Sequence, residues 1–225
     1  MERYFLFNNL NTWLNWNCYL TGKNIADPTP NTNYVKLDGV NGTLDLSESL
    51  TGEITYADRI ITATFWTDYG TRKEREALLR KITAYLHGKK FKIIEPDDTD
   101  HYLYGRVKIT AKTNNLAYAT FTIEATCEPW RYANEEIVRK IDSSYDGEYV
   151  PSAIQKIIIT NNGVKTLCPK ITVVGEVEIG YKGSKIQLST GTYIVPEIKL
   201  QQGTNELTVV SFDGSVTFTY KEATL

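Results

Sequence analysis

The sequence predicts a mainly β protein with one helix, organised as two domains. Short runs rich in β-branched and aromatic residues recur along most of the 225 residues, whereas a single segment shows helical periodicity. A chain of this length suffices for one large domain or two small ones, each with its own hydrophobic core. We therefore expect a β-rich N-terminal domain that carries the helix, followed by a smaller all-β domain.

The predicted helix covers about residues 72–87. Thr71 and Glu74 form a T-x-x-E capping box at its start, and Gly88 is typical of a helix end. Five apolar residues recur between these signals at helical spacing: Leu78, Leu79, Ile82, Tyr85 and Leu86. The helix should therefore pack on the sheet through one face.

Strands are predicted before and after this helix. Residues 59–66 precede it, and residues 91–95 and 103–112 follow it, all rich in strand-forming side chains. Residues 121–127 alternate between apolar and polar side chains, as a half-buried strand requires. Because Thr-Asn-Asn at 113–115 supplies a turn, we expect a hairpin there.

The N-terminal domain is expected to end near Pro129, where the alternation stops. The stretch up to Pro151 is polar and has little periodic apolar content, so we assign residues 1–133 to the first domain, 134–150 to a linker and 151–225 to the second. Seven short strands are predicted beyond the linker, at residues 154–160, 170–174, 177–181, 185–188, 197–200, 206–210 and 216–220. With turns such as Asp213-Gly214 between them, they predict a small β-sandwich of the galectin or carbohydrate-module kind.

Charge and hydropathy exclude two broad classes of protein. Lys and Arg number 25 against 27 Asp and Glu, with a pI near 5.8, so the composition offers no broad basic surface for nucleic acid. No apolar stretch approaches the roughly 20 residues that a membrane-spanning helix needs, and we expect no membrane insertion. The N-terminus lacks the pattern of a secretory signal, so we expect synthesis to finish in the cytoplasm.

No catalytic, metal or cofactor residues are predicted. His87 and His101 stand at no spacing typical of a triad or a zinc site, and the acidic segment 95–100 is interpreted as a solvated turn because it lacks the pattern of a calcium loop. The three cysteines Cys18, Cys127 and Cys168 are odd in number and far apart, which favours reduced, buried thiols. A hydrolase with a carboxylate pair is the least favoured function, because no motif points to such a pair, although the spacing that it requires depends on the fold.

Aromatic residues crowd the first twenty positions, as Tyr4, Phe5, Phe7, Trp13, Trp16 and Tyr19. We interpret them first as core and subunit packing. Aromatic rings also stack on sugars, so a carbohydrate-binding β-sandwich that recognises host cell-wall glycans is kept as the alternative function.

Residues 38–59 contain the patterns Gly-x-x-Gly-x-Leu-Asp-Leu, Leu-x-Gly and Tyr-x-x-Arg, followed by the helix that ends at His87-Gly88 and by Glu128-Pro129-Trp130. In these motifs and their order the chain resembles the distal tail protein family of bacteriophages with long flexible tails. Later matches are Ile159-Thr-Asn-Asn-Gly163, Cys168-Pro-Lys-Ile-Thr and Gln202–Val210, which are similar to the small β-sandwich of the same family. The second domain carries no long insertion that could serve as a receptor-binding arm.

The resemblance implies a ring-forming N-terminal domain and a structural, non-enzymatic role. It implies a homo-hexameric baseplate hub in the virion of a phage or prophage, at the distal end of the tail, which serves host adsorption. The implied partners are the tail tube protein, the tape measure protein and a tail-tip lysin or fibre protein, with DNA passing through the channel without specific binding. The strongest match holds our predicted subunit-interface residues: Asp45, Leu46, Tyr56 and Arg59.

Overall fold

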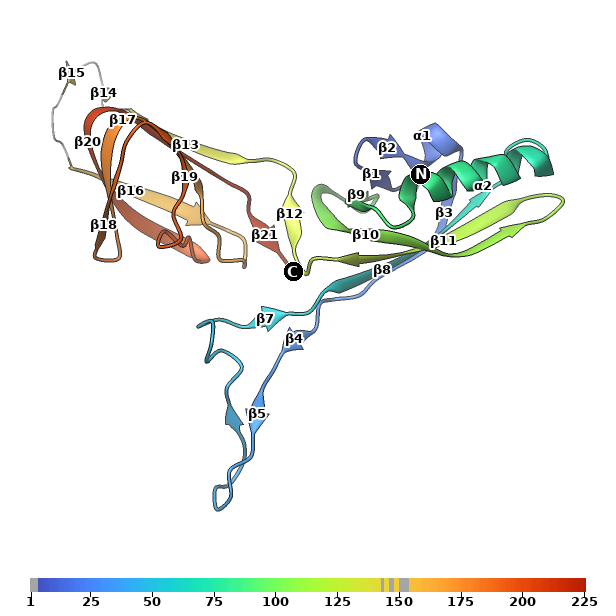
Figure 1. Ribbon diagram of the computed structural model, residues 1–225, viewed down its shortest axis with the longest axis horizontal. Helices are drawn as coiled ribbons and strands as arrows, with labels where there is room; N and C mark the ends of the chain where they lie inside the picture. Colours follow the sequence, from blue (N-terminus) through green and yellow to red (C-terminus); the bar gives the residue numbers. More distant parts are fainter. Residues whose placement is uncertain (1–3, 143, 146–147, 150–153) are drawn as a thin grey trace. The chain divides into compact units, whose positions relative to one another are not determined.

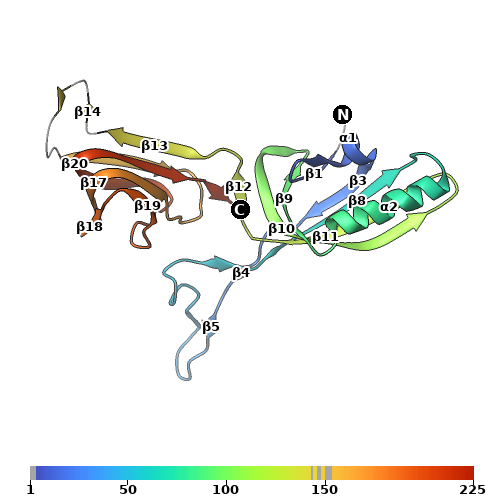
Figure 2. The same cartoon turned by 45° about the horizontal axis from the view of Figure 1, so that its top comes forward.

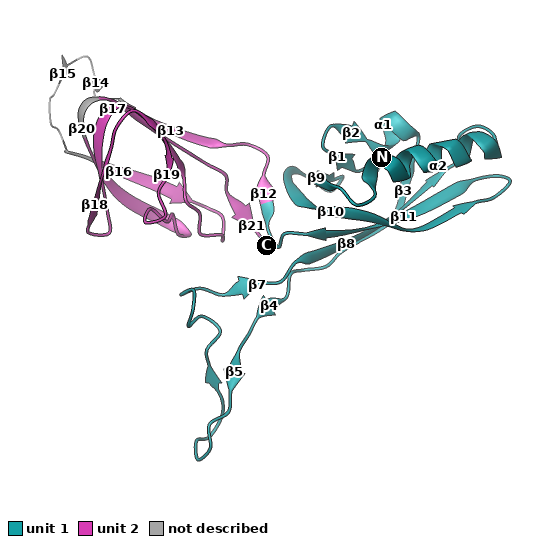
Figure 3. Ribbon diagram, viewed as in Figure 1, with its two compact units in different colours: residues 1–131, 225 teal, residues 132–224 magenta. Residues whose placement is uncertain are grey.

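The computed structural model describes residues 4–142, 144–145, 148–149 and 154–225. The chain forms two compact units, unit 1 with residues 1–131 and Leu225, and unit 2 with residues 132–224 (Figure 3). Strands dominate both units, so the predicted mainly β fold class is confirmed. In the part of the chain that the structure describes, no helix is long and apolar enough to cross a membrane.

Unit 1 is built on an antiparallel sheet with the strand order β2-β1-β9-β10-β11-β8-β3 (Figure 1). In that order, the strands cover Leu10–Asn11, Leu6–Phe7, Lys90–Glu95, Asp98–Asn114, Ala119–Cys127, Arg59–Thr67 and Tyr19–Ile25. The predicted hairpin is present, because β10 and β11 pair from Gly105 opposite Cys127 to Asn114 opposite Ala119. All predicted strands around the helix are found.

Alternation along the strands places one face of this sheet in the core. Ile61, Ala63 and Phe65 of β8 are buried, whereas the residues between them are only partly buried. Phe65 stacks on Phe121 of β11 with ring centroids 4.9 Å apart. Period-two alternation in the sequence therefore located the core of unit 1 correctly.

The acidic segment 95–100 forms the expected turn between β9 and β10, with Asp97 and Asp100 exposed, but its first residue, Glu95, is buried and not solvated as we expected. Glu95 is 7% exposed, pairs with Lys23 of β3 and also accepts from Arg131 at 2.6 Å. Because β3 lies at one end of the strand order and β9 near the other, the Lys23 contact shows that the sheet curls. Burial of a carboxylate requires such partners, so this correction follows from tertiary structure alone.

Helix α2 covers Arg72–Leu86, as predicted. Thr71 Oγ1 accepts from the Glu74 backbone N–H at 3.3 Å, and Glu74 Oε2 accepts from the Thr71 N–H at 2.7 Å, which completes the capping box. Leu79, Ile82 and Leu86 are fully buried in the core of unit 1.

One charged residue of α2 is also buried. Arg75 is 2% exposed, and its guanidinium donates to the backbone oxygens of Gly70 at 2.7 Å, Asn115 at 3.0 Å and Leu116 at 2.7 Å. These bonds hold the turn between β10 and β11 against the helix. The sequence did not reveal this role, because an arginine seldom occupies a core position.

The structure adds a second helix that the sequence analysis missed. Helix α1 covers Thr12–Trp16, with Asn11 Oδ1 accepting from the N–H groups of Trp13 and Leu14 and with Asn17 at φ 52° as its C-cap. Five residues are too few to show a 3.6-residue period, so only the two asparagine caps marked this helix.

Unit 2 is a small β-sandwich organised by two long strands, β17 (Lys170–Tyr181) and β20 (Gly203–Tyr220). All of β17 pairs with residues 207–219 of β20, with a register shift between Glu176 and Val177. The other strands flank their two halves: β13 (Ile137–Asp142), β16 (Ile154–Asn161), β18 (Ser184–Leu188) and β19 (Gly191–Ile194). The register shift is a bulge that bends both strands, so that β17 and β20 each contribute to both layers of the sandwich.

Four predicted strands of unit 2 are therefore halves of two longer ones. The predicted turn at Asp213-Gly214 is wrong, because β20 continues through it and Gly214 lies opposite Gly175 of β17. Both glycines have positive φ, and a Cβ on Gly214 would overlap the backbone oxygen of Val174. The glycines mark a bend with close backbone approach, which a sequence cannot distinguish from a chain reversal.

Two other expectations for this region differ from the structure. Residues 197–199 form no strand, and Leu200 makes only a single bridge with Leu167. The segment 134–150, expected to be a linker, contains β13, which pairs with β20 and packs Ile137 and Ile141 against the core of unit 2. Residues 143, 146–147 and 150 of this segment lie outside the described residues.

Gly105 of β10 should tolerate no side chain. A Cβ there would overlap Cys127 Sγ and the Thr126 backbone oxygen across the strand pair. We expect Gly105→Ala to lower the free energy of unfolding by about 1–3 kcal/mol, because the paired strands must separate locally. Gly22→Ala is the control, since nothing lies within 4 Å of its Cβ position. Chemical denaturation measures both, and equal stability of the two variants would contradict the close approach.

Candidate assembly surface

Residues 26–58, which we call the arm, leave the sheet of unit 1 between β3 and β8 (Figures 1 and 2). In the arm, β4 (Pro30–Asn31) pairs with β7 (Thr55–Tyr56), and β5 (Tyr34–Val35) pairs with β6 (Leu44–Asp45). Each pair is a sheet of its own with two strands. An isolated two-stranded ladder is at best marginally stable in water, so the arm gains stability from any surface that covers it.

The arm also exposes large apolar side chains. Leu50 is 98% exposed, and the other four are between 46% and 59% exposed: Tyr34, Leu37, Val40 and Leu44. None of the five belongs to the core of unit 1. Such a concentration of exposed apolar residues on one segment is typical of an interaction surface. The sequence analysis did not single out these residues. Their lack of helical or strand periodicity was a signal that they belong to no buried face.

Asp45 and Leu46, predicted as interface residues, hold the shape of the arm. The Asp45 carboxylate accepts from the Ser47 backbone N–H at 2.9 Å and from its hydroxyl, and these bonds lower the pKa of Asp45. The Leu46 N–H donates to the backbone oxygen of Asn33 at 2.8 Å, across the arm. Asp45 is exposed and Leu46 partly buried, so Asp45 in particular is available to a partner.

Tyr56 and Arg59 lie at the base of the arm, where the structure brings them to Pro129 and Trp130. Arg59 Nε and Nη2 donate to the Pro129 backbone oxygen at 3.2 and 3.1 Å, and the Tyr56 ring meets the Trp130 ring edge-on at 5.5 Å. The Arg59 side chain is 0% exposed, and burial lowers its pKa. Arg59 therefore acts as a brace: its hydrogen bonds fix the base of the arm to the backbone just after β11 within one chain. A contact of Arg59 with another copy stays a prediction.

The groups that could carry chemistry have structural partners. His87 Nδ1 accepts from the Ile109 N–H at 3.1 Å, and His101 pairs with Asp98 at 2.8 Å. Burial raises the pKa of Cys18 and Cys127 to about 12, as in unreactive thiols. Cys168 is exposed, which corrects the expectation that all three thiols are buried. Among the described residues, no group of three or more His, Cys, Asp or Glu side chains could hold a metal ion.

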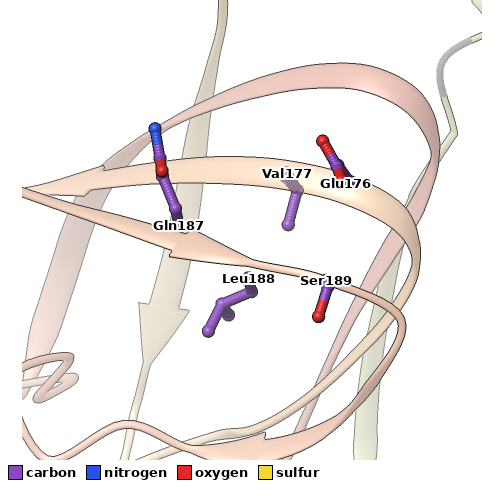
Figure 4. A pocket seen from close by; sticks show the side chains of 5 residues that line it. All are labelled: Glu176, Val177, Gln187, Leu188 and Ser189. Carbon is purple, nitrogen blue, oxygen red and sulfur yellow. The ribbon is translucent and has the colours of Figure 1, made fainter.

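Unit 2 contains a hollow of about 480 Å³ lined by Glu176, Val177, Gln187, Leu188 and Ser189 (Figure 4). Its walls come from the bend of β17 and the end of β18. No aromatic ring is among these lining residues, so the hollow lacks the stacking surface that a sugar-binding site would use.

The crowded aromatic residues of the N-terminus divide between core and surface. Phe5, Phe7 and Trp16 are buried in the core of unit 1, in line with the packing interpretation. Trp13 and Tyr19 instead begin a row of rings on the surface, with Trp13–Tyr19 centroids 4.3 Å apart. The row continues with Tyr19–Trp66 at 5.7 Å and Trp66–Tyr118 at 6.3 Å. These four residues are the surface aromatic row.

Removing the Arg59 brace should destabilise the chain. We expect Arg59→Ala to lower the free energy of unfolding by about 2 kcal/mol, because the Pro129 oxygen loses its two donors and a cavity remains. Asp27→Asn is the control: Asp27 lies 3.7 Å from Arg59 but is 96% exposed, so about 0.5 kcal/mol or less is expected. Urea titration measures both changes, and equal effects would contradict the brace.

Comparison with solved structures places the fold of the chain beside that of a phage protein. No protein-family model matches the chain, and no curated protein matches it. The chain is similar to the crystal structure of the Dit protein (gp 19.1) of SPP1, described as a paradigm of the hub adsorption apparatus in phages that infect Gram-positive bacteria. The TM-score is 0.69 over 97% of this chain and 98% of that chain, at 15% sequence identity. The chain thus has the fold of a phage distal tail protein, and the resemblance seen in its sequence is confirmed at the level of the fold.

Proposed function

We propose that the protein is a structural hub of a phage tail, which assembles into a hexameric ring at the distal end of the tail. The ring would join the tail tube protein to the tip proteins and leave a channel for DNA and the tape measure protein. The fold shared with the SPP1 hub protein supports this role. The tip partner would be a lysin or fibre protein, and the role is one of assembly and host adsorption, without catalysis.

The observation that carries the proposal is that the arm belongs to no larger sheet of its own chain. Its strands pair only with each other, and it exposes five large apolar side chains. A ring of identical subunits needs a heterologous contact, in which one surface patch meets a different patch on the next copy. A segment that leaves its own sheet is suited to that contact, because it can cover a neighbour without displacing its own core.

Ring assembly should depend on the apolar side chains of the arm. We expect the wild-type protein to form hexamers by native mass spectrometry and rings in electron micrographs. The variant Leu37→Ser/Val40→Ser/Leu44→Ser should shift the population to monomers with unchanged unfolding, because these side chains are exposed in the single chain.

The control for this experiment is Ile158→Ser/Ile194→Ser in unit 2. These residues are 62% and 69% exposed, so the variant removes comparable apolar surface outside the arm. It should assemble as the wild type does. A wild-type protein that remains a monomer at its highest soluble concentration would contradict the proposed function.

A carbohydrate-binding role is the second candidate, and the surface aromatic row favours it. Tyr19 and Tyr118 are exposed, and Trp13 and Trp66 are partly buried. Rings in a row at a surface can stack on successive sugars. If the row binds glycans, purified host cell-wall polysaccharide should retain the wild type, and Trp13→Ala should reduce retention. Tyr69→Ala, which removes a 51% exposed ring outside the row, is the control. Equal retention of the two variants, or no retention of the wild type, would reject this candidate.

A further inference from the structure

Unit 1 has a groove of about 350 Å³ beside β9 and β10 that is lined by three cationic side chains and two acidic ones. The cations are Lys90, Arg106 and Lys108, and the ring of Tyr104 lies among them. The two acidic lining residues are Asp58, at the base of the arm, and Glu128, so the cations are in excess by one. We call it the basic groove. Tyr104 is 38% exposed and takes part in a cation–π contact with Lys90 at 5.5 Å, so the groove offers an apolar surface beside its charges.

Two cations of the groove face each other without a counterion. Lys90 and Arg106 are register partners on β9 and β10, and like charges in directly opposite positions destabilise a strand pair. Within the described residues, neither has an ion-pair partner; Arg106 donates only to the Gly88 backbone oxygen. Lys108, in contrast, pairs with Glu124 at 2.6 Å. An anionic partner would relieve the repulsion between Lys90 and Arg106.

The arm carries the complementary charge. Its 33 residues contain six Asp or Glu and one Lys, which gives a net charge of −5. The rest of residues 1–131 contains 15 Lys or Arg against 10 Asp or Glu, a net charge of +5. Asp45 stays ionised well below neutral pH, because Ser47 hydrogen bonds stabilise its carboxylate. Asp38 and Glu48 are exposed.

The arm is long enough to reach a neighbouring copy. Residues 30–40, from β4 to the turn beyond β5, span about 33 Å at the rise of an extended chain. A compact domain of 131 residues has a radius of gyration of about 14 Å, so the arm is about as long as such a domain is wide. Its four short strands pair only among themselves, which leaves its distal half available to a second copy.

We propose that the acidic arm of one copy lies in the basic groove of the next copy around the ring. This inference rests on the proposed function and adds the pair of surfaces that meet. The arm's acidic side chains would lie against Lys90 and Arg106, and its apolar side chains would pack beside Tyr104. Because arm and groove are different patches of one chain, the contact is heterologous and can close a ring.

Charge reversal on each side tests the pairing. The groove variant is Lys90→Glu/Arg106→Glu, and the arm variant is Asp38→Lys/Glu48→Lys. Each alone should weaken assembly by roughly tenfold or more, which corresponds to about 1.4 kcal/mol, because the reversal places like charges opposite one another. The chain with all four substitutions should recover assembly. The wild-type ring should also dissociate more readily as salt concentration rises.

A mixture of the two weakened variants gives the sharpest result. In an alternating ring, each native arm meets a native groove and each reversed arm meets a reversed groove, so every contact joins opposite charges. The mixture should therefore assemble at concentrations at which each variant alone does not. The control is Lys170→Glu/Lys199→Glu, which makes the same charge change at exposed positions of unit 2 and should assemble normally. Unfolding curves of all variants verify that each is folded.

The outcomes separate this inference from the proposed function. If the wild type forms rings and both reversed variants do so equally well, the arm does not occupy the groove, although the hub role stands. If both variants fail and neither the fourfold variant nor the mixture recovers, the pairing is also overturned. If the groove variant assembles but no longer retains duplex DNA at low salt, the groove binds phosphate instead. A wild type that never assembles contradicts the hub role itself.

Discussion

Backbone hydrogen bonding is the constraint on which the organisation of unit 1 depends. Each strand from β1 through β8 in the sheet order pairs with a strand on both sides, so most of the backbone groups in its ladders find partners within the chain. The arm departs from this rule, because its short strands pair only with one another. Its remaining backbone groups are left to water or to another chain, as at any sheet edge. The main sheet therefore depends on pairing within one chain much more than the arm does.

Buried charged residues then determine where distant segments meet. Arg59 holds the Pro129 backbone at the base of the arm, and Arg75 holds the turn between β10 and β11. Glu95 joins β9 to Lys23 and Arg131. Apolar alternation specifies which face of a strand is buried. Many strand registers and loop positions are compatible with the same alternation, so it does not select one of them. Hydrogen bonds from a buried guanidinium are directional, and leaving them unmade is costly, so they select one arrangement.

Positive and negative side chains are nearly equal in number in this chain, but they gather on different parts of unit 1. The whole sequence has a net charge of −2, which indicated no broad basic surface. The fold nevertheless places Lys90, Arg106 and Lys108 in one groove, while the arm gathers acidic residues. Composition averages over the chain and says nothing about which side chains a β ladder sets opposite one another. Local charge therefore has to be read from strand register.

The sequence by itself determined the fold class, the extent of α2 and the hairpin of β10 and β11, because capping boxes and alternation are local signals. Its motifs also indicated the distal tail family. Tertiary structure alone decided that Gly175 and Gly214 bend two long strands instead of ending them, and that Arg59 is buried while Asp45 is exposed. It alone showed the arm as a separate ladder and brought Lys90 opposite Arg106. The physical reason is that burial, bends and cross-strand neighbours depend on which distant residues pair, and no single segment carries that information.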